Sequence, residues 1–112
     1  MEIDKSLKEI GNFRGTEQYH NIMGADVTDG VVYVMNNGYG WVITDALVIC
    51  KMKLKDHPFI AIELKQKDGK AKIVYTDGNG KELYKQEYEY TDATQDLSLY
   101  FIDGVMLLTG EY

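Results

Sequence analysis

The sequence YGWVITDALVICKMKL, at residues 39–54, is the longest apolar segment of the chain and contains its single Trp and its single Cys. At 100° per residue, one wide face of a helix over these residues is apolar, as packing against a core requires. That face consists of Val42, Ile43, Ala46, Leu47, Ile49, Cys50 and Leu54. A strand of this length would be much longer than the average of about 5 to 6 residues. The segment therefore predicts a long central helix.

The opposite side of this predicted helix is also largely apolar. Trp41, Val48 and Met52 line up there, with Asp45 among them. Because a helix that is apolar on two sides is normally covered on two sides, we expect Trp41 to be structural. Its replacement by alanine should then cost about 3 to 5 kcal/mol of stability. If this side is instead open, the same residues are typical of an interaction surface, because hot spots combine large aromatic groups with polar anchors.

The first residues predict a short amphipathic helix. Apolar side chains recur there with helical spacing, and a glycine follows at position 11, where a helix C-cap is expected. The apolar positions are Ile3, Leu7 and Ile10. We expect a helix over residues 2–10 that covers the side of the central helix carrying Trp41.

Glycine-containing turns divide the chain between this helix and the central one into short pieces. We predict strands over residues 17–21 and 31–35. The Asn-Asn-Gly sequence at residues 36–38 is expected to form the turn into the central helix, where an asparagine can accept hydrogen bonds from free backbone N–H groups.

The pattern changes from a period of 3.6 to a period of 2 after residue 58. The predicted strands cover residues 59–66, 71–76, 82–90, 97–102 and 105–109. Asp68-Gly69 and Asp103-Gly104 are expected to adopt positive φ in hairpin turns. Residues 96–102 also suit a short helix. The predicted fold class is therefore α+β: an antiparallel sheet of about five to seven strands packed on one central helix, with a short N-terminal helix.

Length and composition predict a single domain over residues 1–112. This length is near the commonest domain size, and 45% hydrophobic with 27% charged residues is ordinary for a soluble protein. The first residues lack the basic and apolar regions of a signal peptide. The central segment is too short and too polar to span a bilayer. We therefore expect a cytoplasmic protein that does not bind a membrane.

All of the net charge of −6 lies in the last quarter of the chain. Acidic and basic residues balance through Lys85, whereas residues 86–112 contain six acidic residues and no basic one. Such a field repels the phosphate backbone of nucleic acids, and no basic stripe offsets it. The sequence therefore argues against nucleic-acid binding.

The sequence contains no recognisable catalytic or metal-binding motif. His20 and His57 are far apart, and neither has a second ligand at the spacing of a zinc site. Cys50 cannot form an internal disulfide and fits the apolar helix face as a core residue. We therefore predict no catalytic residue, no metal and no cofactor, and a protein that is not an enzyme.

Trp41, Asp45, Tyr19 and His20 are the candidate binding residues. Asp45 is the one charged residue expected in apolar surroundings, which is a common setting for functional carboxylates. A simpler explanation is that it accepts hydrogen bonds from the backbone or from tyrosine hydroxyls of residues 15–33. In an alternative class of function, a small enzyme or a small-molecule or nucleotide binder, Asp45, His20 and Tyr19 would converge in a pocket beside the central helix.

Six short segments form a recognisable set along the chain. They are FRGTEQY at residues 13–19, TDGV at 28–31, WVITDAL at 41–47, DGNG at 77–80, YTD at 90–92 and GVMLL at 104–108. Together they resemble a family of small uncharacterised proteins found in phages, prophages and other bacterial mobile elements. Two features depart from the family pattern: Asp45 follows Trp41 by four residues rather than three, and Thr-Gly-Glu at residues 109–111 replaces the more usual Pro-Ser-Glu. Because the family has no assigned activity, the resemblance implies a biological setting and no mechanism.

We therefore expect an accessory protein of a phage or mobile element that acts without catalysis. Its expected partner is an unknown host or phage protein, or a second copy of the same chain. The acidic charge, the nine tyrosines and the lack of a catalytic motif favour this function, since Tyr is enriched at protein interfaces. A purely structural or self-assembling protein is a further alternative.

Overall fold

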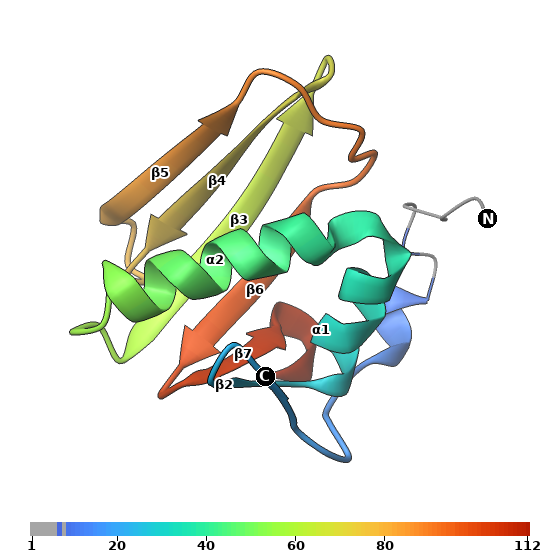
Figure 1. The fold of residues 1–112 in the computed structure, drawn as a ribbon, viewed down its shortest axis with the longest axis vertical. Helices are drawn as coiled ribbons and strands as arrows, with labels where there is room; N and C mark the ends of the chain where they lie inside the picture. The colour runs from blue at the N-terminus through green and yellow to red at the C-terminus, as the bar shows by residue number, and fades with distance from the viewer. Residues whose placement is uncertain (1–6, 8) are drawn as a thin grey trace.

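The computed structural model describes residue 7 and residues 9–112, and it shows one seven-stranded sheet with helices packed on one face (Figure 1). The strands are β1 (His20–Ile22), β2 (Ala25–Val27), β3 (Phe59–Lys67), β4 (Lys70–Thr76), β5 (Glu82–Tyr88), β6 (Leu97–Ile102) and β7 (Val105–Leu108). Their order across the sheet is β1-β2-β7-β6-β3-β4-β5. The predicted α+β fold is confirmed. The sheet is mixed rather than wholly antiparallel, because β2 and β7 run parallel.

The central helix is longer than its apolar segment indicates. It comprises α1 (Asp29–Val34), a kinked segment η2 (Met35–Tyr39) in which Asn37 and Gly38 are not helical, and α2 (Gly40–Met52). The predicted strand over residues 31–35 is therefore wrong, since most of it lies in α1. Thr28 caps α1 by accepting a hydrogen bond from the Val31 backbone N–H. Val31 and Val34 are fully buried at helical spacing, so packing outweighs the strand propensity of the β-branched side chains.

Gly38 produces the bend between α1 and α2. Its φ of 99° lies in the left-handed region, which glycine adopts without steric cost. The Asn37 side chain donates a hydrogen bond to the Tyr33 carbonyl at 2.7 Å. The predicted turn at residues 36–38 is therefore present, as a kink between α1 and α2, but the Asn37 side chain completes the end of α1 rather than the start of α2.

Local sequence patterns predict the C-terminal half of the sheet well. The strands β3 to β7 match the predicted ranges closely, and residues 97–102 form a strand rather than a helix. Both Asp-Gly hairpins adopt positive φ as expected, with φ of 54° and 77° at Asp68 and Gly69, and of 49° and 86° at Asp103 and Gly104. Asp-Gly provides this conformation at low steric cost, which fixes the register of each hairpin.

The N-terminal predictions are less accurate. The strand expected over residues 17–21 begins three residues later, as β1. The helix expected over residues 2–10 lies mostly outside the described residues. Within them, Leu7 is buried in the core and Ile10–Asn12 form a single 3-10 turn, η1. Among the described residues, no helix is long and apolar enough to cross a membrane.

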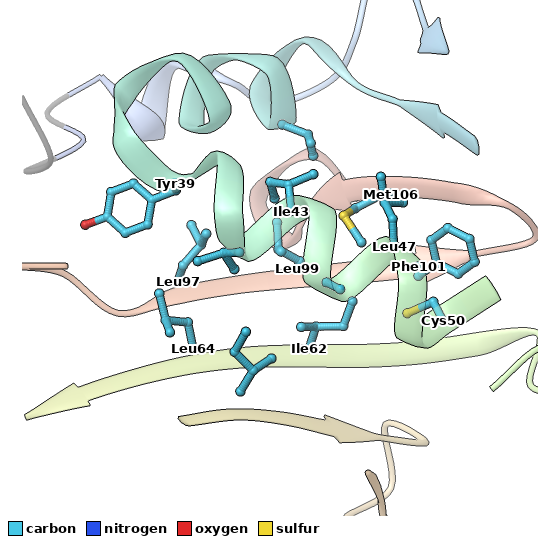
Figure 2. Close-up of a cluster of buried hydrophobic side chains, with 14 of the residues drawn as sticks. Tyr39, Ile43, Leu47, Cys50, Ile62, Leu64, Leu97, Leu99, Phe101 and Met106 are labelled. Atoms are coloured by element: carbon cyan, nitrogen blue, oxygen red, sulfur yellow. The ribbon is translucent and has the colours of Figure 1, made fainter. Parts of the chain in front are cut away.

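The core lies between α2 and the sheet. Figure 2 shows Ile43, Leu47 and Cys50 of α2 directed towards apolar side chains from β3, β6 and β7. All residues of the predicted apolar helix face are buried. On the other face of the sheet, the rings of Phe59 and Tyr100 pack at a centroid distance of 5.0 Å.

Candidate functional site

One side of α2 faces away from the core and carries a row of large side chains. This row, the α2 flank, consists of Trp41, Asp45, Val48 and Met52. Trp41 and Asp45 are half-buried, whereas Val48 is 39% exposed and Met52 is 72% exposed. We expected this side of α2 to be covered by other residues, and the cover is incomplete. No described residue buries the C-terminal half of the flank, at Val48 and Met52.

Tyr88 of β5 covers the N-terminal half of the α2 flank. Its hydroxyl donates a hydrogen bond to Asp45 Oδ2 at 2.7 Å. Its ring packs edge-on against Trp41, with centroids 5.2 Å apart and an angle of 72° between the planes. The tyrosine bound to Asp45 thus comes from β5, and not from residues 15–33 as expected.

The electrostatics of this contact keep Tyr88 neutral. Burial raises the pKa of Tyr88 above its usual value, and the hydrogen bond to Asp45 raises it further. The hydroxyl therefore stays protonated at physiological pH and continues to donate to the carboxylate. Asp45 is thus held in one position beside the Trp41 ring.

A second polar contact lies on the same side of the sheet. The Tyr75 hydroxyl donates to Gln86 Oε1 at 2.6 Å, and the Tyr75 and Tyr84 rings pack edge-on with centroids 6.0 Å apart. Burial raises the pKa of Tyr75 strongly, so this hydroxyl is also neutral. The side of β4 and β5 that faces α2 therefore carries three tyrosines, and the hydroxyls of two of them, Tyr75 and Tyr88, are held by hydrogen bonds.

His20 and Tyr19 lie in another part of the molecule. His20 Nε2 is 2.8 Å from Asp29 Oδ1, and the two side chains are 31% and 26% exposed. This hydrogen bond, followed by one from the Glu17 backbone N–H, lowers the pKa of Asp29. The Asp29 backbone N–H donates to the Thr16 hydroxyl in turn. These bonds attach the loop before β1 to the start of α1, and Tyr19 is 61% exposed.

The structure does not bring the four candidate residues together. His20 is in β1 and the Tyr88 that binds Asp45 is in β5, and these strands form opposite edges of the sheet. Six inter-strand spacings, or about 29 Å at about 4.8 Å each, separate them. His20 therefore does not converge with Asp45, whereas the alternative of a small enzyme or ligand binder requires these two side chains to meet.

Glu111 is a buried carboxylate that the sequence reasoning missed. It accepts hydrogen bonds from the Thr28 hydroxyl at 2.5 Å, the Gly30 N–H at 3.1 Å and the Leu108 N–H at 3.0 Å. A side chain at Gly30 would collide with it, since an added Cβ would lie 2.6 Å from Oε1. Its role is to join the C-terminal segment to the start of α1. An acidic residue after an apolar strand is too common to indicate this role, and the Thr-Gly-Glu at residues 109–111 draws attention in the sequence only for its departure from the Pro-Ser-Glu of the related family.

Within the described residues, Cys50 belongs to no metal site. No group of three or more His, Cys, Asp or Glu side chains within the described part of the chain is arranged to hold a metal ion. Burial raises the pKa of the Cys50 thiol to about 12, so this side chain is a neutral core residue at physiological pH.

Comparison with known proteins places the chain in a family but gives no activity. No curated protein and no solved structure matches it. A family model of unknown function, DUF6876, matches residues 4–112. The expectation of an uncharacterised family is confirmed by this match, which covers nearly the whole chain. The chain belongs to the DUF6876 family of unknown function.

Proposed function

We propose that the protein acts by binding another protein through the α2 flank, as a non-enzymatic accessory protein of a phage or mobile element. The observation that carries the proposal is the exposure of Val48 and Met52 in line with the half-buried Trp41 and Asp45. Single exposed apolar side chains are normal on protein surfaces. Here two of them, Val48 and Met52, continue the line of the half-buried Trp41 on one side of one helix, and such a line of side chains is typical of a contact surface.

The chemistry of the α2 flank suits protein recognition. Aromatic residues and methionine are enriched at interfaces, and the flexible thioether of Met52 can adapt to the shape of a partner. Trp41 and Asp45 are already positioned by Tyr88, so little side-chain entropy is lost when they make a further contact. The flank thus combines an ordered aromatic and polar end with an adaptable apolar end.

The proposed contact is tested by affinity capture from a bacterial lysate with matched variants. Met52→Glu places a charge on the open end of the flank and should abolish capture of a specific protein. Met23→Glu makes the same change at another exposed methionine, 52% exposed in the turn between β1 and β2, and should capture as the wild type does. If no protein is enriched, or if Met52→Glu captures the same proteins equally well, the proposal fails.

Trp41→Ala separates a structural role from a binding role. Removal of the indole leaves the Tyr88 ring without its packing partner. A large drop in melting temperature would support the structural role, for which the full cost of a buried aromatic is about 3 to 5 kcal/mol. An unchanged melt together with altered oligomeric size or lost partner capture would support the interface.

The phage or mobile-element setting rests on the resemblance of the six sequence segments. It is tested independently by the genes that flank the coding sequence in bacterial and phage genomes. Repeated occurrence beside phage or mobile-element genes would support the setting, whereas consistent occurrence among housekeeping genes would contradict it.

A further inference from the structure

The strand β5 is a long unpaired edge of the sheet. Within the described residues, it pairs only with β4, while the other edge strand, β1, has three residues. An edge strand has backbone N–H and C=O groups on its outer side that can pair with another strand. Its length of seven residues is enough to accept one.

The side chains of β5 differ between its two faces. Tyr84, Gln86 and Tyr88 lie on the face towards α2, as the contacts of Tyr88 with this helix show. Lys85 and Glu87 lie on the opposite face, where Lys85 Nζ is 3.1 Å from Glu87 Oε1. Charged side chains on an edge strand oppose pairing wherever like charges come together. The order of these charges therefore decides which pairings are permitted.

One antiparallel register makes the strand complementary to itself. If two copies pair around Gln86, Lys85 of each copy lies opposite Glu87 of the other, and Tyr84 lies opposite Tyr88. A register one residue earlier places Lys85 opposite Lys85, and one residue later it places Glu87 opposite Glu87. Opposite charges and aromatic pairs directly across an antiparallel pair are stabilising, whereas like charges are destabilising.

We propose that the β5 edge binds a second copy of this chain, antiparallel and centred on Gln86, so that one sheet continues through both molecules. The two-fold axis is perpendicular to the sheet, because Tyr84 and Tyr88 of both copies must face the same side. Both α2 helices then lie on the same face of the joined sheet. The pairing covers five residues of each strand, less than a standard interface of about 800 Å² per partner, so the dimer is concentration-dependent.

The test is a charge reversal read by sedimentation or by size exclusion with light scattering. Lys85→Glu places four acidic side chains at the seam, and Glu87→Lys places four basic ones there. Each variant alone should raise the dissociation constant of the dimer about tenfold or more, because two attractive pairs become repulsive. An equimolar mixture of the two variants should form a heterodimer, and the Lys85→Glu, Glu87→Lys double variant should regain the dimer.

Two controls show whether the charge reversals act on the β5 edge alone and leave the fold intact. The Lys85 and Glu87 side chains are 44% and 66% exposed, so reversal leaves the core intact, as circular dichroism will verify. The central strand β3 has an equivalent pair, with Lys65 Nζ 3.1 Å from Glu63 Oε2, and Lys65→Glu should leave the dimer unchanged.

A wild type that stays monomeric at all concentrations overturns the proposal. So does a dimer that is indifferent to the single reversals, or a mixture that fails to associate. None of these outcomes affects the proposed function, since Lys85 and Glu87 lie on the sheet face opposite the α2 flank.

Discussion

Glu111 determines, at the scale of a single residue, how the chain end is joined to the start of α1. Its carboxylate is bound by one hydroxyl and two backbone N–H groups. Glu111→Ala leaves these donors unsatisfied in a buried position, and should lower the free energy of unfolding by about 2 to 4 kcal/mol. Urea denaturation measures the loss, with the exposed Glu89→Ala as a control that should change little. Equal stability of the two variants would show that Glu111 is not structural.

Cys50 makes the free energy of unfolding depend on pH in the alkaline range. Burial raises the pKa of its thiol from 9.0 to about 12, so the folded state holds a proton that the unfolded state releases. The preference of the neutral thiol for the folded state therefore contributes fully to stability below about pH 9. This contribution is lost as the pH rises towards about 12. The free energy of unfolding should therefore fall more steeply between pH 8 and 10.5, roughly, in the wild type than in Cys50→Ala. Denaturant titrations across this range measure both slopes, and parallel slopes would contradict the prediction.

The bend between α1 and α2 governs the structure at the scale of the element. It depends on Gly38, whose φ is 99°. Gly38→Ala forces a side chain into the left-handed region and should cost about 1 to 2 kcal/mol. Gly11→Ala is a suitable control, because an added Cβ meets no atom within 4 Å there. Chemical denaturation of both variants provides the comparison, and a Gly38→Ala protein as stable as wild type would exclude a strained bend.

At the scale of the whole molecule, we expect folding to be independent of metal. The sequence lacks the ligand spacing of a structural metal site, and the core consists of apolar side chains from α2 and the sheet. Treatment with a divalent-metal chelator should therefore leave the melting temperature unchanged. Thermal melts of the dialysed protein with and without added zinc complete the comparison. A shift of several degrees in either direction would contradict the prediction.

Those parts of the fold that depend on local physics follow from the amino-acid sequence alone. The apolar face of residues 39–54 predicts the buried side of α2, because helical periodicity needs no knowledge of the partner surface. The Asp68-Gly69 and Asp103-Gly104 turns, with alternating strands on either side, predict both hairpins, because few residues adopt positive φ readily. Of the candidate site, the same periodicity placed Trp41 and Asp45 on one side of α2.

The features that join distant parts of the chain could not be predicted from local sequence patterns. The β-branched residues at 31–35 form a helix because their packing against the core outweighs strand propensity. The parallel pairing of β2 with β7 joins segments from opposite ends of the chain. The contact of Tyr88 with Asp45 spans 43 residues, and the separation of His20 from Asp45 follows from the strand order. Such contacts depend on how elements pack in three dimensions, a choice that local periodicity and turn preference do not encode.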